Sequence, residues 1–185
     1  MKQLSEMTLQ ELWQLFPIIL TEHRAEWRTW FAEEEALLTE ILPGARISHI
    51  GSTAIRGIQA KPTVDILVET ADDVDWRDVA DGIVGRGGYI CMSRSENRMS
   101  FNKGYTPTGF AERVFHLHLR RMGDNDELYF RDYLNDHADV AAEYERLKLS
   151  LWKQLEHDRD GYTAAKAGFV AKYTKIARQE YAGRY

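Results

Sequence analysis

The sequence contains little cysteine and proline and no long run of apolar residues. Among its 185 residues are one cysteine, Cys91, and four prolines. A single cysteine excludes an intrachain disulfide and a cysteine-based zinc site, and it fits a reduced setting. The apolar run nearest the start, 16–20, falls far short of the roughly 20 residues that cross a membrane, and no signal peptide is visible. We therefore expect a cytoplasmic protein without a membrane segment.

The sequence also lacks any long block of charge of one sign. Charged residues make up 29% of the chain and the net charge is −5, which argues against general nucleic-acid binding. Only the part from 46 to 121 carries a net positive charge, whereas both flanking parts are net negative. This distribution favours an anionic ligand in the middle of the chain.

Hydrophobic periodicity predicts a mixture of helices and strands. Pro17 ends a first helix, and the Pro43-Gly44 pair ends a second. The ranges expected to be helical are 7–16, 25–42, 74–84 and, with breaks near 136 and 158, the chain from 124 to its end. The ranges expected to be strands are 18–20, 47–50, 64–68, 89–93, 98–103 and 113–120, with a loop over 105–109.

The stretch from Ser48 to Glu69 reads as a strand, a Gly-Ser turn, a loop and a second strand. Gly51 lets the backbone turn and approach a ligand closely, and the free N–H groups of such a turn can form an anion-binding concavity. Asp65 lies within the apolar second strand, where an acid costs free energy unless it is paired or metal-bound. This layout is one that can hold a phosphate and its metal ion.

The string HIGSTAIRGIQAKPTVDILVE, with its Gly-Ser pair and following acid, resembles the nucleotidyltransferase superfamily and, much more closely, the GrpB-like family. Further matching blocks lie at 115–119 (FHLHL), 130–134 (FRDYL), 143–148 (EYERLK) and 162–166 (YTAAK), so that the resemblance spans about residues 18–175. It implies an α+β fold with a nucleotidyltransferase-like mixed sheet flanked by helices. We expect one GrpB-like domain over 1–185, with an α/β core at 1–121 and a helical C-terminal subdomain at 122–185.

The resemblance implies that Asp65 is a metal ligand, but the sequence departs from the superfamily pattern at Leu67. A second acid is usual at that position. Glu69 cannot replace it in the metal shell, because four residues of strand span roughly 13 Å. The usual arrangement of two acids and two magnesium ions is therefore in doubt.

His116 and His118 offer a partial replacement for the missing acid. Strand alternation places both on one face, so their rings could converge on one ion together with Asp65. The ion could be magnesium, manganese or zinc, and imidazole suits the transition metals better. The alternative is that both histidines form hydrogen bonds in a polar cleft without a metal.

The remaining candidates surround the Gly-Ser turn. The backbone of Gly51 and the hydroxyls of Ser52 and Thr53 could contact a phosphate, and Arg56 and Lys61 could neutralise it. His49 could carry a proton in catalysis or simply pack at the end of its strand. Tyr162 and Lys166 share one face of a helix; they could close the site from the C-terminal helices, but we expect a role in structural packing. We also expect Cys91 to pack within the sheet.

The sequence is compatible with three functions. The first is a nucleotidyltransferase-like protein that binds a nucleotide or other phosphorylated small molecule and transfers a nucleotidyl group with a metal ion. The second is a non-catalytic nucleotide sensor, which Leu67 favours. The third is a metal-dependent hydrolase that uses Asp65, His116 and His118.

Overall fold

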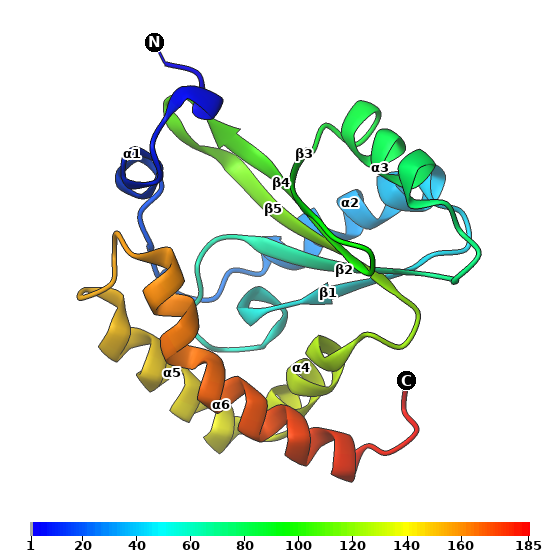
Figure 1. The fold of residues 1–185 in the computed structure, drawn as a ribbon. Helices are drawn as coiled ribbons and strands as arrows, with labels where there is room; N and C mark the ends of the chain where they lie inside the picture. The colour runs from blue at the N-terminus through cyan, green and yellow to red at the C-terminus, as the bar shows by residue number, and fades with distance from the viewer. Residues whose placement is uncertain (1) are drawn as a thin grey trace.

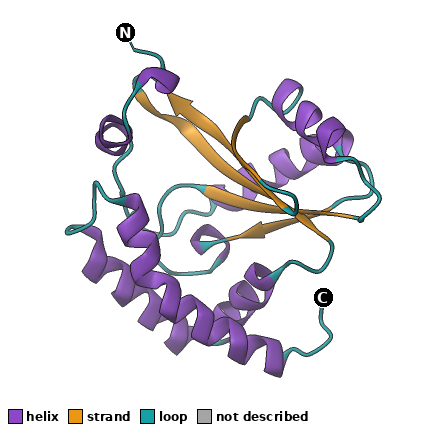
Figure 2. Ribbon diagram, viewed as in Figure 1, coloured by secondary structure: helices purple, strands orange, loops and turns teal. Residues whose placement is uncertain are grey.

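The structure, a computed structural model, describes residues 2–185. A five-stranded mixed sheet is covered by helices on both faces (Figure 1; Figure 2), as the resemblance implied. The strands are β1 (Arg46–Ile50), β2 (Val64–Thr70), β3 (Ile90–Arg94), β4 (Arg98–Thr106) and β5 (Gly109–Arg121). The helices are α1 (Leu9–Leu15), α2 (Glu26–Ile41), α3 (Trp76–Gly85), α4 (Asp126–Asp136), α5 (Ala138–Trp152) and α6 (Arg159–Glu180), with short 3-10 turns at η1 (Leu4–Glu6) and η2 (Ser52–Ala54).

The strand order is β1-β2-β5-β4-β3. β2 and β5 pair in parallel, and the other neighbours are antiparallel. In the parallel pair Asp65 lies opposite His116 and Leu67 lies opposite His118. The sheet thus brings together the acid and the two histidines, which the sequence placed on separate strands.

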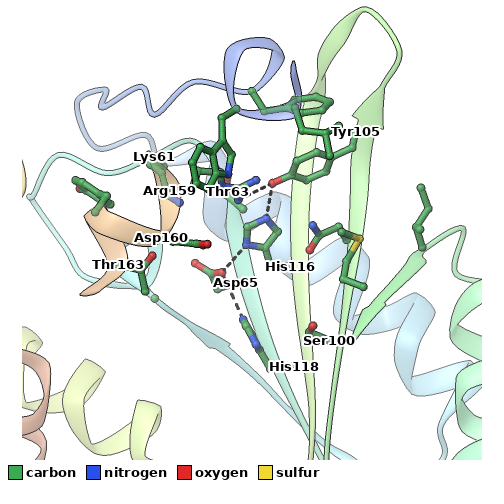
Figure 3. Close-up of a pocket in the computed structure, with 18 of the residues that line it drawn as sticks. Lys61, Thr63, Asp65, Ser100, Tyr105, His116, His118, Arg159, Asp160 and Thr163 are labelled. Atoms are coloured by element: carbon green, nitrogen blue, oxygen red, sulfur yellow. Dashed lines mark hydrogen bonds and ion pairs between the residues drawn. The ribbon is translucent and has the colours of Figure 1, made fainter. Parts of the chain in front are cut away.

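Alternation along β2 divides its residues between two cores. Val64, Ile66 and Val68 are fully buried in a cluster shared with α2 and α3. The opposite face of the sheet is covered by α4, α5 and α6, whose own core is rich in aromatic residues such as Phe130 and Tyr144. Asp65 belongs to that second face, so its carboxylate points toward the C-terminal helices (Figure 3).

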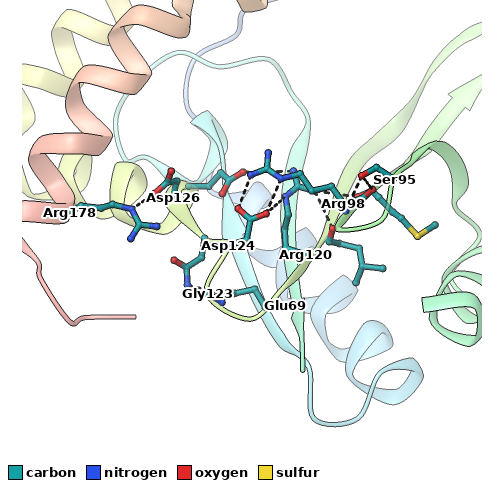
Figure 4. Close-up of polar contacts among 12 residues, drawn as sticks. Glu69, Ser95, Arg98, Arg120, Gly123, Asp124, Asp126 and Arg178 are labelled. Carbon is teal, nitrogen blue, oxygen red and sulfur yellow. Dashed lines mark hydrogen bonds and ion pairs between the residues drawn. The ribbon is translucent and has the colours of Figure 1, made fainter. Parts of the chain in front are cut away.

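Glu69 fastens the end of β2 to its surroundings. Its carboxylate accepts two hydrogen bonds from Arg46 on β1, at 2.6 and 2.7 Å. The backbone N–H of Gly123 and the amide of Asn125 also donate to it, each at 3.0 Å. Nearby ion pairs from Arg98 to Asp124 and from Arg178 to Asp126 extend this network to the β3–β4 turn and to α6 (Figure 4).

Several sequence predictions need correction. Residues 18–20 form no strand; only Thr21 makes an isolated bridge, to Ala60, and Ile18 instead donates its N–H to the carbonyl of Glu156. The expected loop at 105–109 is a tight turn, because β4 continues to Thr106 and β5 begins at Gly109.

Cys91 is exposed rather than packed, because β3 is an edge strand whose residues are all exposed. Within residues 2–185, no helix has the length and apolar character required to cross a bilayer.

Candidate functional site

A cleft of about 1070 Å³ opens between the sheet, the N-terminal segment and the C-terminal helices. Its polar part contains Asp65, both strand histidines and Tyr105, faced by residues at the start of α6 (Figure 3). Four of the elements that form it come from widely separated parts of the chain: α1, β2, the β4–β5 hairpin and α6. The cleft is thus a product of the tertiary fold.

Asp65 lies at the centre of this polar part. Its Oδ1 atom is 3.3 Å from Nδ1 of His116 and 3.7 Å from Nε2 of His118. Burial acts to raise the pKa of Asp65, but the hydrogen bonds and charges of the two histidines outweigh it and hold that pKa well below its usual range. Asp65 is therefore a carboxylate at neutral pH, paired with the imidazole rings.

Tyr105 and Arg159 orient the ring of His116. The Tyr105 hydroxyl lies 2.7 Å from Nε2 of His116, and Arg159 donates to the same hydroxyl at 3.0 Å. Since arginine can only donate, the phenol proton is free to point at Nε2, and this leaves the N–H at Nδ1 to face Asp65. Burial lowers the pKa of His116, in keeping with a neutral ring in this tautomer.

Gly51 allows the turn to lie directly against Asp65. Its φ of 71° is in the left-handed region, and a Cβ at this position would lie 2.3 Å from Asp65 Oδ2. A side chain here would displace the carboxylate. The positive φ fits the turn expected at this glycine. The close approach seen here is to Asp65, and an approach to a ligand stays a prediction.

His49 and the hydroxyl of Thr53 face each other behind the turn. Thr53 donates to the Thr63 carbonyl at 3.1 Å, so its oxygen accepts from Nε2 of His49 at 2.9 Å. The His49 ring stacks on Phe31 with 4.9 Å between centroids, and burial lowers its pKa to about 4. Thr53 lines the cleft, whereas His49 is outside the lining and serves to position the turn.

Arg56 is the phosphate candidate that the fold places outside the cleft. It is exposed, and its backbone N–H and guanidinium donate to Asn135 of α4. Ser52 and Lys61 both line the cleft. The sequence-predicted residues brought together are therefore Gly51, Ser52, Thr53, Lys61, Asp65, His116 and His118.

Four cations of the cleft lie close to one another. They are Lys61, Lys148, Arg159 and Lys166, and among the described residues none of them is ion-paired within 4.0 Å. Burial and, to a smaller extent, a neighbouring cation lower the pKa of Lys61 and of Lys166 to about 8 and that of Lys148 to about 7. The cleft carboxylates are Asp65 and Asp160, so cations outnumber acids.

Lys148 and Arg159 were missed by the sequence analysis, because each lies on a C-terminal helix with no spacing that links it to the Gly-Ser motif. Lys148 is only 2% exposed and donates to the Gln59 carbonyl. A lysine in the apolar stripe of α5 was the available signal. Asp160 also lines the cleft, next to Asp158, which caps α6 by accepting from the N–H of Gly161.

The paired-acid arrangement of the superfamily does not fit this cleft. Leu67, at the position of the usual second acid, is fully buried against Ile50 and Leu128, and Glu69 is fully engaged elsewhere. Asp65, His116 and His118 do converge, yet residues 2–185 contain no group of three such side chains arranged to hold a metal ion. The metal site inferred from the sequence stays a prediction.

Comparisons with known proteins agree with this fold. A UPF0157 protein of Pseudomonas aeruginosa is 38% identical over 145 residues, which cover 76% of this chain and 59% of the relative. The glutamate-rich protein GrpB of Alkalihalophilus pseudofirmus is 35% identical over 161 residues, covering 83% and 91% respectively. The chain thus spans about three fifths of the first relative and about nine tenths of the second.

Among solved structures, the conserved protein GrpB from Enterococcus faecalis superposes with a TM-score of 0.75 at 29% identity, covering 88% of this chain and 99% of that one. The Cid1 poly(U) polymerase gives a TM-score of 0.50 at 12% identity and covers 76% of this chain and 43% of its own, a likeness of fold alone. The family model described as GrpB protein matches residues 17–176. The chain belongs to the GrpB family and has a nucleotidyltransferase-like fold.

Proposed function

We propose that this protein binds a nucleotide or another phosphorylated small molecule, with the phosphates among Lys61, Lys148 and Lys166. The observation that carries the proposal is a cluster of lysines beside the Gly-Ser turn that have no carboxylate partner among the described residues; Lys148 is buried, and Lys61 and Lys166 are half-buried. Like charges held close together and partly shielded from water destabilise one another. A polyphosphate would restore their partners through charge-assisted hydrogen bonds, and the turn would add backbone donors.

Calorimetric titration with inorganic triphosphate and with ATP, both without added metal, tests this proposal. We expect Lys61→Met and Lys166→Met each to weaken binding by about tenfold, equivalent to about 1.4 kcal/mol. Lys175→Met is the matched control, because Lys175 is an exposed lysine on the same helix as Lys166 and lies outside the cleft. Absence of binding, or an equal loss in the control, would contradict the proposal.

A metal-dependent transfer or hydrolysis is the second candidate. The observation in its favour is that Asp65 Oδ1 lies between nitrogens of His116 and His118, a donor set better suited to zinc or manganese than to magnesium. Because the side chains as placed make no ready metal site, an ion would have to draw them together.

Titration of the wild type with zinc, manganese and magnesium, repeated for the double variant His116→Ala/His118→Ala, tests this second candidate. Binding that is lost in the double variant would support it. The variant Asp65→Asn then distinguishes a non-catalytic sensor from an enzyme. A sensor should retain ligand binding in this variant, whereas an enzyme should lose turnover.

A further inference from the structure

The cleft has an apolar half that the proposed phosphate site leaves unused. One wall is α1, which contributes Leu9, Leu12 and Trp13, and the other is β3, which contributes Ile90 and Met92. Leu9, Ile90 and Met92 are 56%, 49% and 57% exposed. Three large apolar side chains are thus open to solvent inside one cavity, whereas isolated exposed apolar residues would be unremarkable.

α1 has an apolar face with nothing packed tightly against it. None of its residues is buried, although an amphipathic helix is normally stabilised by burying that face. The helix is nevertheless held in place at both ends. Thr8 and Glu11 form a reciprocal capping box at its start, and at its end the carbonyl of Trp13 lies 3.1 Å from Nδ1 of His157.

The residue after α1 joins this wall to the polar part of the cleft. Phe16 is 3% exposed, and its ring centroid lies 4.7 Å from that of Tyr105 and 5.0 Å from that of Phe110. Tyr105 is the residue that contacts His116. The apolar wall and the Asp65 site are therefore continuous, and one ligand can contact both.

We propose that the ligand is a phosphorylated compound with a flat aromatic group, as in a nucleotide, and that this group lies between α1 and β3 against Trp13. This inference rests on the proposed function, which places the phosphates among the lysines. A volume of about 1070 Å³ is slightly above the usual range for small-molecule sites and far exceeds the needs of a phosphate alone. Aromatic rings stack on tryptophan with little dependence on the identity of the base.

The test compares three probes: inorganic triphosphate, a nucleoside triphosphate such as ATP, and octyl phosphate as a phosphate with an aliphatic chain. Each is titrated calorimetrically into the wild type, Trp13→Ala, Trp13→Phe and Gln14→Ala. Trp13→Phe keeps an aromatic ring, and Gln14→Ala is the matched control on the same helix, at an exposed position outside the cleft. Circular dichroism checks folding, which α1 variants should preserve because the helix has no buried residue.

We expect the nucleotide to bind at least tenfold more tightly than inorganic triphosphate. Trp13→Ala should weaken nucleotide binding by about tenfold and leave the affinity for inorganic triphosphate unchanged. Trp13→Phe should retain most of the affinity, and Gln14→Ala should behave as wild type.

The outcomes separate the two proposals. If the nucleotide and inorganic triphosphate bind equally well and Trp13→Ala changes neither, the apolar half is not a ligand subsite, while the phosphate site stands. Tighter binding of octyl phosphate than of the nucleotide would overturn the proposal that the ligand carries a flat aromatic group, and would indicate an aliphatic chain. A dimer seen by sedimentation in the wild type but not in Trp13→Ala would show that the apolar wall binds a second copy of the chain. If no phosphate probe binds the wild type, the proposed function itself fails.

Discussion

Gly51 shows how much of the site depends on single residues. A Cβ at this position would overlap the Asp65 carboxylate, and the positive φ there suits glycine. β1 ends at Ile50, the residue before Gly51, and Ile50 pairs with Asp65 across β1 and β2. The turn and the acid are thus fixed relative to each other by strand register.

Replacing this glycine should damage the site more than backbone strain alone predicts. Gly51→Ala places an alanine in the left-handed region, which costs about 1–2 kcal/mol of stability. Its Cβ would also clash with Asp65 Oδ2. Gly44→Ala is the matched control, because Gly44 has a φ of 88° and a Cβ there would enter open space. We expect Gly51→Ala to lower the free energy of unfolding in urea by about 2 kcal/mol more than Gly44→Ala does. Equal losses would show that the Asp65 contact does not matter for stability.

The Asp65–His116 pair makes a prediction about proton binding. Burial lowers the pKa of His116, and the Asp65 carboxylate acts in the opposite direction. Asp65→Asn removes the second effect, so the pKa of His116 should fall further. Titration of the imidazole proton signals by NMR measures this, with His157 as the internal control, since it lies outside the cleft and bonds to the Trp13 carbonyl. A rise or no change for His116 would contradict the assigned pairing.

One face of strand β2 contributes both to the cleft and to the connections that hold the sheet together. Asp65 reaches the cleft, while Glu69 joins β1 to the connection between β5 and α4. Leu67 between them is buried. Two residues four positions apart on one strand therefore have different roles, Asp65 in the cleft and Glu69 in joining neighbouring elements.

Glu69→Gln should be a stability variant with little effect on the cleft. It removes one charge from a fully buried carboxylate that is paired with the partly exposed Arg46, which we expect to cost about 2 kcal/mol. Glu156→Gln is the control, since Glu156 pairs with the exposed Lys153 at 3.7 Å, and it should change stability by less than about 0.5 kcal/mol. Urea unfolding measures both variants. A phosphate affinity that falls in Glu69→Gln under native conditions would show that the two roles are coupled.

The sequence predicted local features well and distant pairings poorly. Strand alternation in FHLHL correctly placed His116 and His118 on one face, and the helix break expected near 136 is the end of α4 at Asp136. Periodicity shows which face of a helix is apolar, but not which remote strand that face meets. It therefore missed Lys148 on α5, and it could not place α1 over the cleft.

For the whole molecule, the lysine cluster should make stability depend on pH. The folded-state pKa values of Lys61 and Lys166 are about 8, against about 10.4 for an unfolded lysine. Between these values the unfolded chain binds more protons, so the free energy of unfolding of the ligand-free protein should rise as pH increases from about 7.5 to 9.5. Lys61→Met/Lys166→Met should flatten this rise, and Lys175→Met should not.

Over the same pH range, affinity for inorganic triphosphate should fall, because the cations that hold it lose their protons. Urea unfolding at about pH 7.5 and 9.5, with and without triphosphate, measures both trends. Stability and affinity that change in the same direction would contradict the assignment of the lysines as the anion site.

The parallel pairing of β2 with β5 has a further consequence for how the protein acquires its site. These neighbours in the sheet are separated in sequence by α3, β3 and β4, and pairing between distant strands is intrinsically slow to form. A chain in which only the local β3–β4–β5 meander has folded holds both histidines but keeps them apart from Asp65. In refolding experiments, ligand binding should therefore lag behind the recovery of secondary structure and coincide with the last cooperative step.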